Sequence, residues 1–196
     1  MGFTMKSISL INVSFAYGGA DALFDNLSAV FHANQTVAIV GDNGTGKSTL
    51  LKIIAGRILP TSGMVKTFGR IAYLDQDLSL LSPDKTVVEN IMHVSECKLH
   101  DAHAIAANFG FRGDASRRRV GTLSGGELLK ATLAAVLGGE NHPDLLILDE
   151  PTNNLDMNST DILADALRQY RGAILMVSHD ADFVRAAAPD WHTIRI

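Results

Sequence analysis

Apolar residues follow two different periods along this chain, and the change between them predicts alternating strands and helices. Three short apolar, partly β-branched runs are typical of strands buried on both faces: 36–40, 145–148 and 173–177. A segment with apolar residues at helical spacing follows each of them: 49–55, 159–170 and 181–187. Strand–helix alternation of this kind predicts an α/β protein with a mostly parallel core sheet.

The first third of the chain also contains segments with a period of two. Residues 6–17 alternate, but the apolar phase slips at 10–11, which predicts an edge strand with a bulge. After Gly18-Gly19 the segment 22–31 alternates again and is expected to pair with it as a second, antiparallel strand. Two more short strands are expected at 64–68 and 70–74. The segments 6–17 and 22–31 predict an N-terminal antiparallel β portion.

Between about 78 and 123 the pattern becomes helical. Thr86 and Glu89 have the spacing of a capping box at a helix start, and 99–109 forms another helical segment. A further helix is expected to open at 123–127 and to end at Gly138-Gly139. We therefore expect a single domain spanning 1–196, with a core of about 6–77 and 136–196 and an inserted helical subdomain of about 78–135.

Composition narrows the class of protein. The chain has 196 residues, 46% of them hydrophobic, and a formal net charge of −4, so no overall basic field attracts nucleic acid and no DNA partner is expected. The basic run Arg117-Arg118-Arg119 is expected to be a solvated face, with a phosphate or RNA contact as the alternative. Cys97 is the single cysteine, no apolar run is long enough for a membrane span, and no signal peptide is evident, so the expected location is the cytoplasm.

A glycine-rich segment directly follows the run 36–40 and directly precedes a predicted helix. It reads Gly41-Asp42-Asn43-Gly44-Thr45-Gly46-Lys47-Ser48-Thr49, the pattern of a phosphate-binding loop. In this context the backbone N–H groups and the helix N-terminus can surround a phosphate, Lys47 can neutralise it, and the Ser48 hydroxyl can ligate Mg²⁺. The alternative is a glycine-rich turn before a helix. We expect a nucleoside triphosphate site formed by Gly41, Asn43, Gly44, Thr45, Gly46, Lys47, Ser48 and Thr49.

Two adjacent acids end the apolar run 145–148. Ligands of open α/β sheets sit beyond the carboxyl ends of the strands, so Asp149 is expected to face Mg²⁺ and Glu150 the water that attacks the γ-phosphate. The alternative is a pair of exposed loop acids. Burying both carboxylates without a cation or a proton relay would be costly, which favours the site.

Other polar residues stand where a strand ends or a helix begins. Gln76 can contact Mg²⁺ or the attacking water, His179 can donate to the γ-phosphate, and Tyr17 can stack on a base. Taken singly, Gln76 and His179 are more often structural, and Tyr17 is nearly as well explained as an edge aromatic. Ser124-Gly125-Gly126 forms a second bare helix N-terminus, although a plain N-cap with Glu127 in the first turn explains it too.

The chain order of these motifs resembles that of ATP-binding cassette (ABC) domains. Such domains carry a Walker A loop, a glutamine loop, a Leu-Ser-Gly-Gly signature, a Walker B strand followed by Glu, and a switch histidine. Here these correspond to 41–48, Gln76, 123–127, 145–150 and His179. The resemblance spans Tyr17 to about Val184 and implies an ABC-type P-loop fold, ATP and Mg²⁺ as cofactors, and ATP hydrolysis.

Within that superfamily the chain looks most like the soluble, translation-associated ABC-F group. The segment from Asp149 to Asp156 (Asp-Glu-Pro-Thr-Asn-Asn-Leu-Asp) is similar to that group's version, although Asn154 replaces the His of many members. The resemblance makes Asp156 the D-loop residue. ABC-F proteins usually carry two cassettes joined by a charged linker, whereas this chain has one cassette, which looks like the C-terminal one.

The resemblance also implies that ATP is sandwiched between two cassettes, with Walker A from one and Ser124, Gly125, Gly126 and Glu127 from the other. The second cassette is a copy of this chain or a sibling domain. The implied catalytic residues are Glu150, His179 and Gln76, and the implied Mg²⁺ ligands are Ser48, Gln76 and, through water, Asp149. A role on the ribosome is expected first. The alternatives are a transporter subunit that docks on a membrane permease through the helices of 78–123, and a DNA-repair-type ATPase head, which the lack of coiled-coil heptads disfavours.

Overall fold

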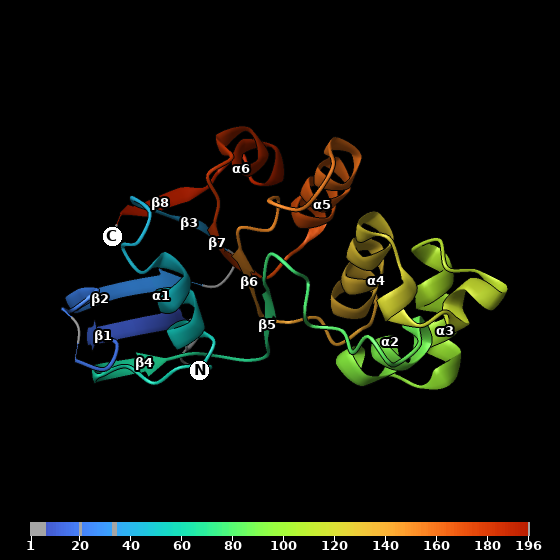
Figure 1. Cartoon of the computed structure of the whole chain (residues 1–196), viewed down its shortest axis with the longest axis horizontal. Coiled ribbons are helices and arrows are strands. Elements are labelled where there is room, and N and C mark those ends of the chain that lie inside the picture. The colour runs from blue at the N-terminus through green and yellow to red at the C-terminus, as the bar shows by residue number, and fades with distance from the viewer. Residues whose placement is uncertain (1–6, 20, 33–34, 196) are drawn as a thin grey trace, which may run out of the picture.

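The structure is a computed structural model that describes residues 7–19, 21–32 and 35–195 (Figure 1). The expected strand start at Lys6 and the expected turn at Ala33 and Asn34 lie outside the described residues. The strands are β1 (Ser7–Phe15), β2 (Phe24–His32), β3 (Thr36–Val40), β4 (Ser62–Lys66), β5 (Ile71–Leu74), β6 (Leu145–Asp149), β7 (Ala173–Val177) and β8 (His192–Arg195). The α-helices are α1 (Lys47–Ile54), α2 (Val87–Ser95), α3 (Leu99–Asn108), α4 (Gly125–Leu137), α5 (Met157–Gln169) and α6 (Ala181–Ala187). Short 3₁₀ turns η1 (Gly113–Arg117) and η2 (Val120–Thr122) precede α4.

A parallel sheet forms the centre of the molecule, which confirms the expected α/β class. Its strand order is β5-β6-β7-β3-β8, and all the pairings are parallel. The carboxyl ends of β3, β5, β6 and β7 therefore lie along one edge of the sheet. Strand β8 was not predicted. It has four residues, is mostly polar, and pairs only along its β3 side, so its sequence carries little of the pattern of a buried strand.

The antiparallel sheet is present as expected, but its strand order is β2-β1-β4. The prediction that 6–17 forms an edge strand is therefore wrong, because β1 is the central strand and pairs on both sides. The expected irregularity is real. Both ladders of β1 shift register beyond Leu10 or Ile11, and Asn12 has a left-handed backbone with φ of 49°. The pairing with β4 joins segments about fifty residues apart, which local alternation cannot reveal.

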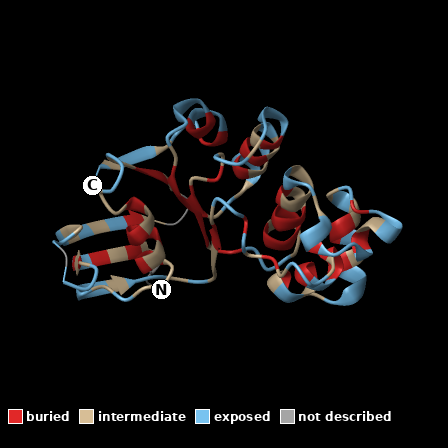
Figure 2. Ribbon diagram, viewed as in Figure 1, coloured by how far each residue is buried: buried red, intermediate tan, exposed pale blue. Residues whose placement is uncertain are grey.

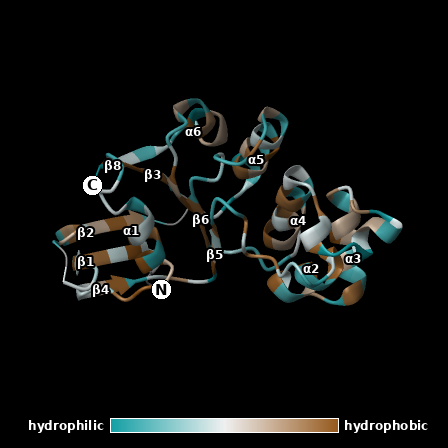
Figure 3. Cartoon of the chain, viewed as in Figure 1, coloured by the Kyte–Doolittle hydropathy of each residue, from teal (hydrophilic) through white to brown (hydrophobic). Residues whose placement is uncertain are grey.

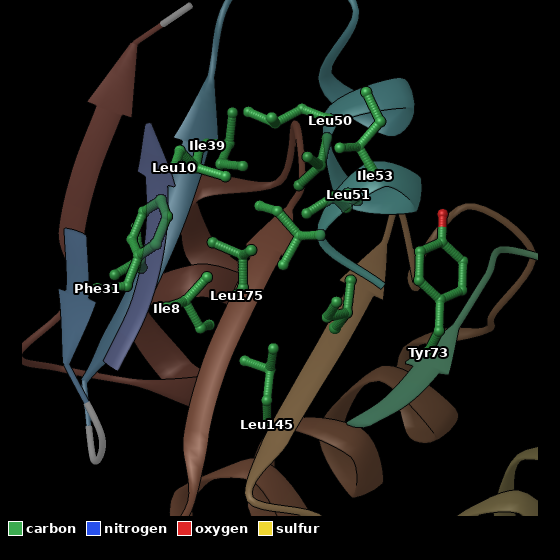
Figure 4. Close-up of a cluster of buried hydrophobic side chains, with 14 of the residues drawn as sticks. Ile8, Leu10, Phe31, Ile39, Leu50, Leu51, Ile53, Tyr73, Leu145 and Leu175 are labelled. Atoms are coloured by element: carbon green, nitrogen blue, oxygen red, sulfur yellow. The ribbon is translucent and has the colours of Figure 1, made fainter. Parts of the chain in front are cut away.

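The central strands are buried on both faces, as their continuous apolar runs require (Figures 2 and 3). Alternate residues of β6 serve different layers. Leu145 and Ile147 pack in a cluster with α1 and the antiparallel sheet, whereas Leu146 and Leu148 pack with α4, α5 and α6. Figure 4 shows the first cluster, with Leu50 and Leu51 of α1 facing Ile39 and Leu175. The sheet is thereby clamped between two layers, and this holds its carboxyl edge in place.

Helices α2, α3 and α4 pack together at the end of the molecule opposite the antiparallel sheet (Figure 1). Their own cluster includes Val87, Ile91, Ala102 and Ala134, while Leu129 of α4 packs in the cluster of the central sheet. Helix α4 therefore belongs to both bodies and crosses the expected boundary at 135, so the division into core and helical subdomain stays a prediction. Among the described residues no helix has the length and apolarity of a membrane span.

Candidate functional site

The phosphate-binding loop connects β3 to α1 and uses glycine where the backbone demands it. Gly44 and Gly46 have φ of 88° and 93°, a region that residues with a Cβ rarely adopt. Gly46 is also the N-cap of α1, and a Cβ added there would come within 3.2 Å of the Phe24 ring. The first turn of α1 carries no acidic residue, so the positive end of its dipole is not neutralised locally. The loop therefore has the backbone and charge of an anion site.

Lys47 lies within the loop and is only 8% exposed. Its Nζ donates to the carbonyl oxygens of Gly41 at 2.8 Å and Asp42 at 2.7 Å. An ammonium has three N–H donors, so these two bonds leave one for a phosphate oxygen. Thr45 closes the loop by donating its hydroxyl to the Asp42 carbonyl at 3.1 Å. The buried ammonium has carbonyl partners but no carboxylate within ion-pairing distance among the described residues, which suits an anionic ligand.

The carboxylate of Asp149, at the end of β6, is held by two hydroxyl groups. Ser48 Oγ donates to Asp149 Oδ1 at 2.8 Å, and the Tyr73 hydroxyl donates to Asp149 Oδ2 at 2.7 Å. Burial, and then the bond to Asp149, raise the pKa of Tyr73 above its usual range, so the phenol stays a donor. Hydroxyl and carboxylate oxygens are ligands that Mg²⁺ prefers, so Ser48 and Asp149 fit that ion. Sequence reasoning gave Tyr73 no role, although a buried tyrosine hydroxyl normally requires a partner.

Glu150 and His179 lie together where β6 and β7 end. Glu150 has φ of 49°, unusual for a residue with a side chain, and its N–H donates to the Val177 carbonyl at 2.9 Å. His179 Nε2 lies 3.0 Å from Glu150 Oε1, and the His179 backbone N–H donates to Oε2 at 3.3 Å. The neighbouring strand β7 thus orients the glutamate, as a candidate base and its positioning group require.

The loop, Glu150 and His179 meet at one pocket of about 540 Å³, whose lining does not include the predicted Gly41, Thr45 and Asp149. Its lining residues are Tyr17, Leu23, Asn43, Gly44, Gly46, Lys47, Ser48, Thr49, Glu150, Asn153, Val177 and His179. Nine of them were predicted from the sequence, whereas Leu23, Asn153 and Val177 were not. The Tyr17 hydroxyl lies 3.1 Å from Thr49 Oγ1, and its ring stands edge-on to Phe15, half exposed at the pocket. That position suits a flat ring stacked beside the loop.

The structure does not bring every predicted residue to this pocket. Gln76 is exposed and does not line it, and its backbone carbonyl accepts a bond from Asn154 at 3.3 Å. Asp156 caps α5 by accepting from the Ser159 N–H at 2.7 Å, and that bond lowers the pKa of its carboxyl. The proposed roles of Gln76 and Asp156 therefore stay predictions.

The segment 124–127 also lies outside the pocket and forms a complete capping box at the start of α4. Ser124 Oγ accepts from the Glu127 N–H at 3.3 Å, and Glu127 Oε2 accepts from the Ser124 N–H at 2.9 Å. Arg118 donates to both Glu127 carboxylate oxygens, at 2.6 and 3.2 Å, and these bonds lower the Glu127 pKa to about 2. Arg117, Arg118 and Arg119 are all exposed, as expected for a solvated face, but Arg118 also has an ion-pair partner nine residues away that local sequence does not signal.

Comparisons with known proteins agree with this geometry. The ABC transporter family model matches residues 24–153. The chain is 37% identical over 173 residues to the ATP-binding protein Uup of Buchnera aphidicola, covering 85% of this chain and 29% of that protein. It is 34% identical over 191 residues to the ATP-binding cassette sub-family F member 2 of Mus musculus, covering 93% and 30%. The chain thus spans about 30% of the length of these relatives.

Two solved structures share the fold. A metal-chelate type ABC transporter in an inward-facing conformation superposes with a TM-score of 0.77 at 25% identity, covering 97% of this chain and 79% of that one. A bacterial Atm1-family ABC exporter with ATP bound gives a TM-score of 0.75 at 21% identity, covering 94% and 36%. The match over 24–153 and the order of the motifs lead to one conclusion: the chain belongs to the ATP-binding cassette family, as an ATP-binding domain whose relatives include members of sub-family F.

Proposed function

We propose that the pocket binds ATP with Mg²⁺ and hydrolyses it. Lys47 and the loop N–H groups hold the phosphates. Ser48 and, through water, Asp149 would hold Mg²⁺, which when bound would supply charge neutralisation on the phosphates. Glu150 accepts the proton of the attacking water, and His179 keeps its carboxylate oriented. The observation that carries this proposal is the convergence of the loop, Glu150 and His179 on one pocket, with Asp149 bonded to Ser48 of that pocket.

We further propose that a second cassette completes the site. The chain has one phosphate-binding loop and one Ser124 segment, and the latter does not reach the chain's own pocket. Ser124 and Gly125 are exposed at the start of α4, and Met157, at the start of α5, is 86% exposed. Members of this family generally dimerise. An exposed helix start with a serine hydroxyl and two glycines, beside an exposed apolar side chain on the next helix, suits a face that meets a partner's phosphates and protein surface.

The physiological role we propose is that of an ABC-F switch in the cytoplasm that acts on the ribosome, with no DNA partner. Similarity to sub-family F over more than 90% of the chain supports this role. The second candidate is the ATP-binding subunit of a membrane transporter, which the 25% identity and TM-score of 0.77 with a transporter favour.

Co-sedimentation separates the two candidates. The Glu150→Gln variant, locked with ATP, would be mixed with ribosomes or with membrane vesicles from the same cells and pelleted. We expect ATP-dependent recovery with ribosomes. Recovery with membranes alone would favour the transporter subunit, and the Lys47→Ala variant, which should not hold ATP, is the control for both.

A further inference from the structure

A line of three hydrogen-bonding side chains runs from the end of β5 into the nucleotide site. We propose that Tyr73 is a positioning residue for Mg²⁺: its hydroxyl holds one oxygen of Asp149 so that the other stays directed at Ser48. This inference rests on the proposed function, since it assumes that Mg²⁺·ATP binds at Ser48 and Asp149. It adds a residue from β5 to a site otherwise formed by β3, β6 and β7.

The pairing of β5 with β6 brings the two groups together. Tyr73 lies opposite Ile147 in this parallel ladder, two residues before Asp149 on the neighbouring strand. The phenol reaches along the sheet and donates to Oδ2 at 2.7 Å, while Ser48 donates to Oδ1 at 2.8 Å. Figure 4 shows the Tyr73 hydroxyl level with the end of β6. With a donor fixed on each oxygen, the carboxylate cannot turn about its terminal bond without breaking one of them.

The Tyr73 ring is itself held in place. It packs in the buried cluster that contains Leu145 and Ile53, and its exposed fraction is 4%. The Arg57 guanidinium lies over the ring at 4.1 Å from its centroid, and Arg57 Nη1 lies 4.0 Å from Asp75 Oδ2. Arg57 stands just beyond α1 and covers one face of the ring, and Asp75, just beyond β5, is the ion-pair partner of that guanidinium.

Loss of the hydroxyl would leave Asp149 Oδ2 without a donor in a region that is almost entirely buried. The carboxylate would then rotate or draw in water, and its other oxygen would lose its fixed direction toward Ser48. Residues that orient a metal ligand in this manner typically change metal affinity by about 10–100-fold when substituted. The hydrogen bonds that hold Lys47 go to the Gly41 and Asp42 carbonyls and do not involve Tyr73 or Asp149, so nucleotide binding without metal should be unaffected.

The test compares Tyr73→Phe with Tyr170→Phe, both in the full chain. Tyr170 is the matched control, because its hydroxyl also donates to a buried partner, the Pro143 carbonyl, but lies outside the nucleotide pocket. Binding of a fluorescent ATP analogue would be measured in EDTA and across a Mg²⁺ titration. For Tyr73→Phe we expect the Mg²⁺ concentration at half-saturation to rise about 10-fold or more with unchanged binding in EDTA, and for Tyr170→Phe no change in either.

Arg57→Ala is the second variant, since it keeps the hydroxyl and releases the ring. It should shift the Mg²⁺ half-saturation in the same direction by a smaller factor. Wild-type Mg²⁺ dependence in whichever of the two variants folds would overturn the proposal. An equal loss of binding with and without Mg²⁺ would do so as well, because it would show a purely structural role. If the wild-type chain itself bound no Mg²⁺·ATP, the proposed function would fail, and the two failures are thereby distinguishable.

Discussion

At the scale of single residues, the chemistry of this domain depends on a few residues that have an unusual backbone conformation or a buried charge. Glu150 occupies a left-handed conformation that costs roughly 1–3 kcal/mol for a residue with a side chain. The bond from its N–H to Val177 and the contacts of its carboxylate with His179 hold it there. The buried Lys47 ammonium has only carbonyl partners among the residues that the structure describes. Each arrangement lowers the stability of the fold but gives the side chain a defined position at the pocket.

Glu150→Gln should keep ATP binding and stop turnover. The amide retains the size and the Oε1 acceptor for His179 but cannot take a proton from water, and loss of a general base costs about 10²–10⁴-fold in rate. Steady-state phosphate release should fall by at least 100-fold, and an ATP-bound dimer should appear on a sizing column. Glu140→Gln, an exposed substitution outside the pocket, is the control. Normal turnover by Glu150→Gln would remove Glu150 as the base.

Lys47→Ala should abolish detectable nucleotide binding at micromolar concentrations. A hydrogen bond from a charged group contributes about 1.5–3 kcal/mol, which corresponds to a loss of roughly 10–100-fold, and the two loop carbonyls would lose their partner as well. Calorimetric titration with ATP measures the effect. Lys52→Ala removes a lysine from the same helix away from the pocket and should bind as wild type.

At the scale of elements, helices α2 and α4 begin with the same device. Thr86 with Glu89 and Ser124 with Glu127 each form a capping box, and both satisfy the first N–H groups of their helix. The boxes differ in their surroundings. Helix α2 starts beside Arg119, with which Thr86 forms an isolated bridge, whereas α4 starts with exposed Ser124 and Gly125. Because the two caps are locally alike, comparing them separates the stability lost with a cap from the activity lost with a contact to a partner chain.

Ser124→Ala and Thr86→Ala should destabilise the domain alike, each by about 1 kcal/mol, because each loses one N-cap. Only Ser124→Ala should lower the ATPase rate at saturating ATP, since only that hydroxyl is proposed to face a partner's nucleotide. Urea unfolding and phosphate release on the same samples decide the matter. Equal effects of the two variants on turnover would show that Ser124 acts only as a cap.

The Arg118–Glu127 pair should weaken in acid. Its bonds lower the pKa of Glu127 from the ordinary 4.5 to about 2, so the pair stabilises the folded state fully above pH 4.5. That contribution declines as the pH falls toward 2, because the folded state no longer gains from holding the charged form. The difference in unfolding free energy between wild type and Glu127→Gln should therefore shrink from pH 5 to pH 3. It should also shrink in 1 M salt, because the pair is exposed. A difference that grows in acid would contradict this assignment.

At the scale of the whole molecule, the nucleotide site lies at one edge of a sheet that is packed on both faces. The start of helix α4, which carries the segment 124–127, does not line that site. Helix α4 packs against both the central sheet and the helices α2 and α3. The nucleotide pocket and the start of α4 are therefore carried by one body. In the function proposed above, a complete catalytic site requires two such bodies.

The ATPase rate per molecule should rise with protein concentration. If two chains share each nucleotide, turnover follows the fraction of dimer, so specific activity should increase until association saturates. Phosphate release measured over a 100-fold range of chain concentration, with excess Mg²⁺·ATP, tests this. A constant rate per molecule would argue against a shared site between copies of this chain.

Much of the fold and of the site could be predicted from the sequence, because the signals are local. The buried strands are continuous apolar runs, and the loop 41–49 has a backbone requirement that only its glycines meet. Eight pocket residues followed from the loop motif and from the rule that parallel strands present their carboxyl ends at one edge, and Tyr17 followed from its place after the first strand. The role of Gln76, inferred from its place after a strand and from resemblance, and that of Asp156, inferred from resemblance alone, stay predictions.

The sequence by itself determined the class of fold, the phosphate loop and the paired acids, since each depends on neighbours within a few residues. Only the tertiary structure decided that β1 is central, that β8 completes the sheet, and that Arg118 binds Glu127. The tertiary structure alone showed that the Tyr73 hydroxyl donates to Asp149, across a strand pairing that joins segments more than seventy residues apart. Such pairings depend on where distant strands and helices are packed, and the periodicity of one segment carries no information about its partner in space.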